Sequence, residues 1–170
     1  MAKKISLREF QQSLSQKLQS VSQGTGQAAQ LGVQAGSVYW LVNLSDTGEI
    51  VPVPELTPVP LTHPWFSGIA NIRGNLFSVV DFSAFQGEEP TQLNVDSRLL
   101  LVGQKFSVNF ALLITRTLGL KNVQHFKIRE SATSAKPWIG ALYVDDEGNE
   151  WKTLYIQGLI EHPNFLQVGT

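Results

Sequence analysis

From residue 38 onward, short runs of Val, Leu, Ile, Phe and Tyr are separated by Gly, Pro, Asp and Asn at intervals of about ten residues. Short strands joined by turns give this pattern, whereas an amphipathic helix needs apolar residues at three- and four-residue spacing over a longer stretch. The sequence therefore predicts an all-β barrel or sandwich. The expected strands span residues 38–44, 49–53, 75–82, 98–103, 108–115, 138–144 and 151–156.

The connections between these strands carry recognisable turn chemistry. Asp46-Thr47-Gly48 and the segment from Asp145 to Asn149 are rich in residues that favour tight turns, so each is expected to join neighbouring strands as a hairpin. Residues 86–94 are expected to form an exposed loop between two lobes. Prolines remove backbone donors from the stretch before residue 65, which predicts an extended edge and not a central strand. They are prolines 52, 54, 58, 60 and 64.

The N-terminal part of the chain has a different pattern. Ser6 and Glu9 have the spacing of a capping box, and apolar residues follow at helical spacing, which predicts an amphipathic helix over residues 6–21. A linker rich in Gly, Ser and Gln follows, so we divide the chain into residues 1–30 and a two-lobed domain of residues 31–170. The helix either covers part of the β core or binds a partner. Its apolar stripe consists of Leu7, Phe10, Leu14, Leu18 and Val21.

Composition narrows the classes of function. A length of 170 residues suits one domain, and a net charge of -1 gives no broad attraction to nucleic acid or to an anionic membrane surface. The chain has no Cys, which excludes disulfides and thiolate chemistry and fits a reducing compartment. No apolar run is long enough to span a bilayer. We therefore expect a cytoplasmic protein that is not inserted into a membrane.

No arrangement of residues predicts catalysis or metal binding. His63, His125 and His162 lie far apart and show no metal-ligand spacing, and no GxSxG or SxxK motif accompanies the serines. Glu88 and Glu89 lie in a loop flanked by Gly87 and Pro90, whereas general acid-base catalysis needs a pocket around its carboxylates. We expect no cofactor and no metal ion, and this favours a binding protein over an enzyme.

The most informative segment is HPWFSGIANIRGNLFSVVDF, which spans residues 63–82. Pro64 suits the first turn of a short helix, Gly68 permits a close approach of backbone, and Gly74 is placed to end the turn with a positive φ. The segment is therefore expected to form a helical turn that leads into a strand. Both faces of that strand are largely apolar, so one of them must contact something other than water.

Three side chains in this segment have two possible roles each. Arg73 is the one long cation within the apolar stretch, and it either forms a structural salt bridge or anchors an interface. Trp65 and Phe66 are expected in the core, although paired aromatic residues beside a turn also make interface anchors.

Residues Pro64–Gly74, followed by Val79-Val80-Asp81-Phe82, resemble the signature of the CheW family, G[VI]xN[LI]RG followed by xxPVVDL. The likeness extends over residues 37–162 and is weaker in the second half. The wording Ala-Asn-Ile-Arg-Gly-Asn-Leu is most similar to the adaptors of type IV pilus chemosensory systems. Three positions depart from the family pattern: Ser78 stands where Pro is usual, and Thr115-Arg116 replace a Val-Asp pair, so contacts of the second lobe are not transferred.

The resemblance implies two intertwined five-stranded SH3-like barrels and a non-catalytic adaptor. Such an adaptor couples the cytoplasmic tip of a chemoreceptor to the regulatory domain of a CheA-like histidine kinase, here in the control of twitching motility. Asn71, Arg73 and Gly74 fall on the receptor-binding motif, and Glu49 falls on a position associated with kinase binding.

Two other functions remain as alternatives. One is a small-molecule sensor in which Trp40, Trp65 and a cleft between the lobes enclose a ligand. The other is a hydrolase, which requires His63 or His125 beside a nucleophile.

Overall fold

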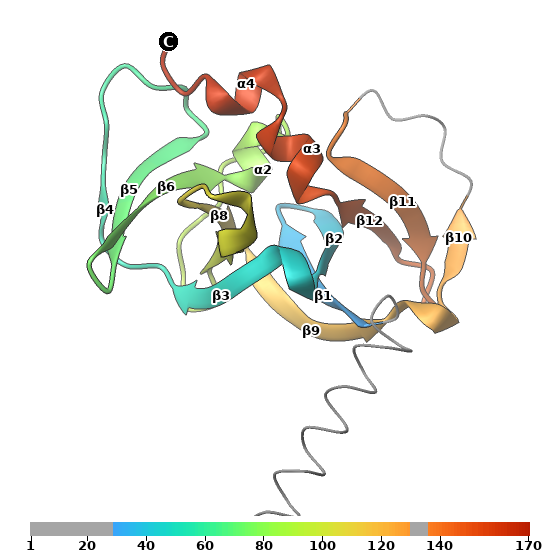
Figure 1. Ribbon diagram of the computed structural model, residues 1–170. Coiled ribbons are helices and arrows are strands. Elements are labelled where there is room, and N and C mark those ends of the chain that lie inside the picture. Colours follow the sequence, from blue (N-terminus) through green and yellow to red (C-terminus); the bar gives the residue numbers. More distant parts are fainter. Residues whose placement is uncertain (1–28, 130–135) are drawn as a thin grey trace, which may run out of the picture.

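The computed structural model describes residues 29–129 and 136–170, which form two β-sheets with a few short helices (Figure 1). The strands of sheet A are β1 (Ala29–Ala35), β2 (Val38–Asn43), β9 (Arg116–Asn122), β10 (Lys127–Arg129), β11 (Ile139–Val144) and β12 (Glu150–Leu154). Those of sheet B are β3 (Thr47–Pro52), β4 (Leu56–Thr57), β5 (Phe66–Ile72), β6 (Asn75–Asp81), β7 (Arg98–Val102) and β8 (Phe110–Ile114). The helices are α2 (Phe82–Phe85), α3 (Ile156–Ile160) and α4 (Pro163–Leu166), and the 3-10 turns are η1 (Leu44–Asp46), η2 (Gln104–Phe106) and η3 (Val123–His125).

The chain passes from one sheet to the other and back. β1 and β2 belong to sheet A, β3 to β8 build sheet B, and β9 to β12 complete sheet A. The strand orders are β10-β11-β12-β2-β1-β9 and β3-β7-β8-β6-β5-β4, in which β12 pairs with β2 and β6 pairs with β8 in parallel. The all-β, two-lobed fold is therefore confirmed. Each sheet has six strands instead of the expected five, because the short edge strands β4 and β10 add one to each.

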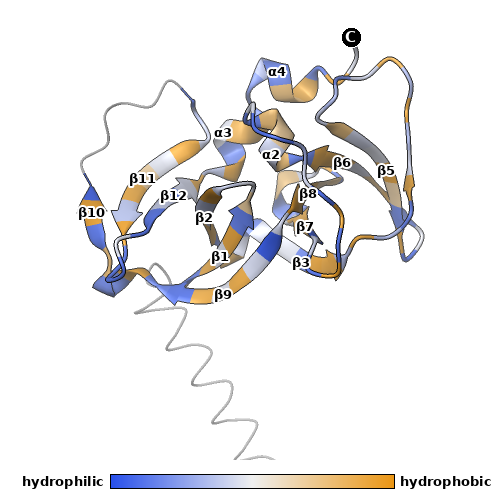
Figure 2. Cartoon of the chain, turned by 180° about the vertical axis from the view of Figure 1, so that it is seen from behind, coloured by the Kyte–Doolittle hydropathy of each residue, from blue (hydrophilic) through white to orange (hydrophobic). Residues whose placement is uncertain are grey.

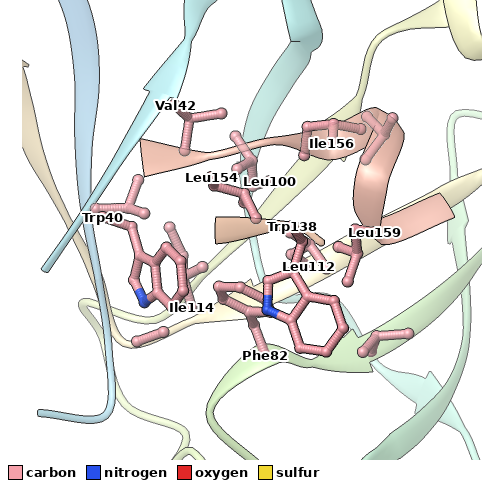
Figure 3. Packing of buried hydrophobic residues seen from close by; sticks show 14 of the residues in the cluster. Trp40, Val42, Phe82, Leu100, Leu112, Ile114, Trp138, Leu154, Ile156 and Leu159 are labelled. Atoms are coloured by element: carbon pink, nitrogen blue, oxygen red, sulfur yellow. The ribbon is translucent and has the colours of Figure 1, made fainter. Parts of the chain in front are cut away.

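A single large core lies between the two sheets. In Figure 3, Trp40 from β2 lies near Phe82, and Val42 from the same strand lies beside Leu154 of β12. The rings of Trp40 and Phe82 are 4.9 Å apart, and both side chains are almost fully buried. Figure 2 shows hydrophobic residues of α2, α3, β6 and β8 in this middle region. We call this set of residues the shared core, since both sheets contribute to it.

Strand β8 explains why parts of the sequence read as unbroken apolar runs. All five of its residues are buried. Because side chains alternate across a strand, Phe110, Leu112 and Ile114 enter the shared core, whereas Ala111 and Leu113 enter a second cluster inside the sheet B lobe. A strand that is buried on both faces has no solvent-exposed side, so its sequence does not alternate between apolar and polar residues.

The expected strands all appear, with ends shifted by a few residues, but β1, β5, β9 and β10 were not expected. The sequence of β1 is AQLGVQA and that of β9 is RTLGLKN, so neither has the density of β-branched residues that marks the other strands. They form because they pair with each other and β1 also pairs with β2. The predicted helix over residues 6–21 lies outside the described residues.

One expected hairpin is wrong and the other is confirmed. Residues Asp46 to Gly48 carry the chain from sheet A to sheet B, since β2 and β3 belong to different sheets. The carbonyl of Asp46 accepts the N–H of Gly103 at 2.9 Å, and this bond fixes the crossover. Residues 145–149 do connect β11 to β12 as an antiparallel pair. The proline-rich stretch contains β4, an edge strand, as expected.

A buried carboxylate organises the end of β6. Asp81 is 4% exposed and accepts hydrogen bonds from the backbone N–H groups of Ser83 (3.1 Å), Ala84 (3.3 Å) and Thr91 (2.7 Å), and from the Thr91 hydroxyl (2.8 Å). It therefore caps α2 and holds the following loop against it. This structural role accounts for the acidic residue within the VVDF sequence.

We expect Asp81→Ala to lower the free energy of unfolding by about 3 kcal/mol, because it leaves buried backbone donors without acceptors. Urea denaturation measures this loss. Asp96→Ala, which removes an exposed carboxylate from the turn before β7, serves as the control and should change stability by less than about 0.5 kcal/mol. Equal effects of the two substitutions would contradict the role assigned to Asp81.

Candidate partner-binding site

The predicted receptor-binding residues lie at the tip of the β5–β6 hairpin. Ile72 is paired with Asn75, so Arg73 and Gly74 form a two-residue loop. Their φ angles are 52° and 83°, and a loop with two positive φ angles is of type I′. The positive φ expected at Gly74 is confirmed, but it belongs to a hairpin and not to the end of a helix.

The expected helical turn before this loop is wrong. Pro64 and Trp65 form a single turn, closed by the Phe66 N–H on the carbonyl of His63 at 2.9 Å, and β5 begins at Phe66. Phe66, Gly68 and Ala70 are buried, but Phe66 belongs to the shared core and Ala70 to the second cluster inside the sheet B lobe, because the register shifts between Phe66 and Gly68. The pairing of β5 with β6 therefore determines the structure of this segment, although Pro64 favours a helical turn.

Gly68 and the two aromatic residues have the roles expected of them. Gly68 has φ 124°, and a Cβ atom there would lie 2.3 Å from the carbonyl oxygen of Thr57, so β4 and β5 approach too closely for any other residue. Phe66 is 9% exposed in the shared core. Trp65 is half-buried and packs against that core, with its ring 5.1 Å from Phe85.

Arg73 forms an ion pair with Glu49 of β3. Its Nη1 donates to Oε2 of Glu49 at 2.6 Å and its Nη2 donates to Oε1, so the guanidinium and the carboxylate meet as two parallel forks. The side chains are 70% and 46% exposed. The hydrogen bond from Arg73 has the largest effect on the pKa of Glu49 and lowers it, desolvation opposes this effect, and the positive charge of Arg73 adds a smaller lowering. A structural salt bridge was one of the two roles that the sequence allowed for Arg73, and this salt bridge is present.

Asn71 holds the loop from the other side. Its Oδ1 accepts the backbone N–H of Gly74 at 2.9 Å. Across the hairpin, Asn71 is paired with Leu76, whose side chain is 60% exposed. The structure therefore brings Asn71, Arg73 and Gly74 together and adds Glu49, from a strand 24 residues earlier, to the same surface.

A cavity of about 260 Å³ opens beside the ion pair. Ile72, Phe77 and Leu101 give it an apolar lining, and Asn75 and Asn109 contribute amide groups. Arg73 and Glu49 are the two charged residues among those that line it. We call this space the hairpin cavity. Nothing in the sequence pointed to it, since its walls come from four separate strands and from the segment before β8.

The histidines are dispersed in the structure. His63 stacks on Trp65 at 5.4 Å, His162 packs edge-on against Trp138 at 4.9 Å, and His125 lies on an exposed turn. Within residues 29–129 and 136–170, no three His, Asp or Glu side chains are grouped in a way that could hold a metal ion. In the same part of the chain, no helix has the length and apolar character needed to cross a membrane.

The arrangement of tryptophans does not match the proposed sensor cleft. Trp40 is 1% exposed and packs inside the shared core. Trp65 lines a separate surface cavity of about 370 Å³ with His63, Asn164 and Gln167. The two rings therefore do not enclose one ligand between them.

Comparison with known proteins decides the family. The model of the CheW-like domain matches residues 30–163. The chain belongs to the CheW family. A relative, the protein PilI of Pseudomonas aeruginosa, is 26% identical over 144 residues, which are 82% of this chain and 79% of PilI.

The fold agrees with that of a solved CheW protein. The crystal structure of the scaffolding protein TtCheW from Thermoanaerobacter tengcongensis superimposes with a TM-score of 0.61 and 17% sequence identity. The match covers 75% of this chain and 88% of TtCheW. The residues predicted to bind the receptor, Asn71, Arg73 and Gly74, lie at the tip of the β5–β6 hairpin of this fold.

The two glycines of the hairpin should differ in their tolerance of a side chain. Gly74→Ala meets no atom within 4 Å of its Cβ, so we expect only the backbone cost of a positive φ, about 1 kcal/mol. Gly68→Ala must push β4 away from β5 and should cost roughly 3 kcal/mol or more. Urea denaturation of both variants tests the difference, and equal losses would contradict the hairpin geometry.

Proposed function

We propose that this chain is a non-catalytic adaptor that couples a chemoreceptor to a CheA-like histidine kinase. The observation that carries the proposal is the exposed hairpin tip. Asn71, Arg73 and Gly74 lie there together, and Arg73 forms an ion pair with Glu49. Membership of the CheW family supports the adaptor role. The likeness to PilI supports a place in a chemosensory pathway that controls type IV pili and twitching motility.

In this proposal Asn71, Arg73 and Gly74 contact the cytoplasmic tip of the receptor, and Glu49 contributes to the contact with the regulatory domain of the kinase. The protein acts in the cytoplasm and is recruited to receptor arrays at the membrane. It needs no cofactor and no nucleic acid. Its contribution is to hold two partners at a fixed separation, and a two-sheet body with one shared core suits this task.

Co-sedimentation with a receptor-tip fragment and with a kinase regulatory domain tests the proposal. We expect the wild-type protein to bind both, and Arg73→Glu to weaken binding of the receptor fragment at least tenfold. The substitution breaks the pair with Glu49 and reverses the charge at the tip.

The matched control is Arg129→Glu. Arg129 forms a similarly exposed ion pair with Glu150, with side chains 63% and 40% exposed, but it lies in sheet A. It should bind both partners as the wild type does. If the folded wild-type protein binds neither partner, the adaptor role is wrong. If Arg73→Glu binds the receptor fragment normally, the adaptor role survives and the assignment of Arg73 is wrong.

A further inference from the structure

A row of apolar residues crosses sheet A and ends in an uncovered leucine. Leu120 of β9 is paired with Leu31 of β1, and directly paired residues project from the same face of a sheet. The row continues through Val42 of β2 to Leu154 of β12, and these three residues belong to the shared core. They are 7%, 0% and 2% exposed, whereas Leu120 is 64% exposed. Among the described residues, the shared core therefore ends at β1 in this row and leaves the same face of β9 open.

The outer edge of β9 is open as well. β9 is the last strand in the order of sheet A, and it pairs with β1 on one side. Figure 1 shows it along the lower edge of the two sheets. Within residues 29–129 and 136–170, no strand pairs with its other side. A free strand edge beside an exposed apolar side chain attracts other chains, and proteins often cover such an edge with a helix or a loop.

The N-terminal part of the chain joins the sheet at this edge. Ala29, the first described residue, is paired with Asn122 of β9, two residues from Leu120. On the other side of β1, the turn η1 lies against the same strand, and its Leu44 is 43% exposed. Two exposed leucines therefore flank the point at which residues 1–28 enter the sheet.

The sequence before Ala29 supplies an apolar surface of matching size. The predicted helix over residues 6–21 carries its apolar side chains on one stripe. As a helix this segment is about 24 Å long, and a strand of the length of β9 is about 23 Å long. Residues 22–28 join the two and span about 25 Å when fully extended. The stripe can therefore reach Leu120 and lie along the whole strand.

We propose that the predicted N-terminal helix packs lengthwise on the open edge of sheet A, with its apolar stripe against Leu120 and Leu44 of the same molecule. A short linker favours this contact over one with a second molecule, because it holds the helix at an effective concentration on the order of mM. The contact extends the shared core across β9 and shields the free edge from other chains. Of the two roles that the sequence left open for the helix, the covering of the β core is thereby assigned. The contact needs neither the receptor nor the kinase.

Hydrogen exchange of the full-length chain, followed by mass spectrometry, tests whether the helix is docked. We expect the amides of residues 6–21 to exchange at least tenfold more slowly in the wild type than in an isolated peptide of the same sequence. Leu120→Asp should remove most of this protection, because it places a charge under the apolar stripe. Ile128→Asp is the matched control, since Ile128 is 72% exposed on β10, the strand at the opposite edge of sheet A. It should leave the protection unchanged.

Engineered disulfides test which face of the helix meets the sheet. The chain has no Cys, so a pair of introduced cysteines reports on one contact alone. Leu14→Cys lies within the apolar stripe, whereas Gln12→Cys lies on the opposite face of the predicted helix. Combined with Leu120→Cys, the first should form a disulfide within one molecule at least tenfold faster than the second. Thermal melting curves verify that each variant is folded.

Three results would overturn the inference. If residues 6–21 exchange as fast in the full-length chain as in the isolated peptide, the helix is not docked. Equal loss of protection in Leu120→Asp and Ile128→Asp would mean that β9 is not the docking surface. Disulfides that join two molecules, and not two positions of one molecule, would mean that a second copy supplies the helix.

Discussion

The rest of the structure depends on the packing of the two sheets against each other through the shared core. Trp40 comes from sheet A, Phe82 follows the last residue of β6 in sheet B, and their rings are in contact. Leu154 and Ile156 bring the end of β12 and the start of α3 into the same cluster. Neither sheet can bury its inner face without the other, because each supplies the apolar surface that the other lacks.

This constraint explains the path of the chain. Strand β2 lies near the start of the domain and β12 near its end, yet the two pair in parallel in the centre of sheet A. All of sheet B is formed by the chain between them. The hairpin tip with Arg73 is consequently carried on a sheet whose back is fixed against the shared core, while its loop is fixed by Asn71 and Glu49. The surface around Arg73 therefore has a fixed orientation relative to the two sheets.

The sequence predicted those parts of the fold that are determined locally. Central strands such as β8 are visible because burial on both faces demands an unbroken apolar run. The strands β1 and β9 are not visible, since their stability comes from pairing with partners that lie far away in the sequence. The residues from Asp46 to Gly48 are of types that favour a hairpin turn. However, β3 pairs with β7, so the strand that follows this turn belongs to the other sheet.

In the candidate site too, features that are determined locally were predicted, and features that depend on distant parts of the chain were not. Gly68 and Gly74 were recognised because backbone geometry restricts which residues fit there, and the resemblance to the family motif predicted Asn71 and Arg73 as binding residues. The pairing of Arg73 with Glu49 remained one of two alternatives, because exposed ion pairs between distant residues leave no pattern in a sequence. The cavity beside them depends on the relative positions of several strands, and only the folded chain reveals it.

The central claim is that one molecule holds a receptor and a kinase at the same time. Mass photometry of the purified chain mixed with a receptor-tip fragment fused to a soluble carrier and with a kinase regulatory domain measures this directly. The account predicts a species whose mass equals the sum of all three components. A mixture that contains only the two binary complexes, each displaced by the other partner, would contradict it.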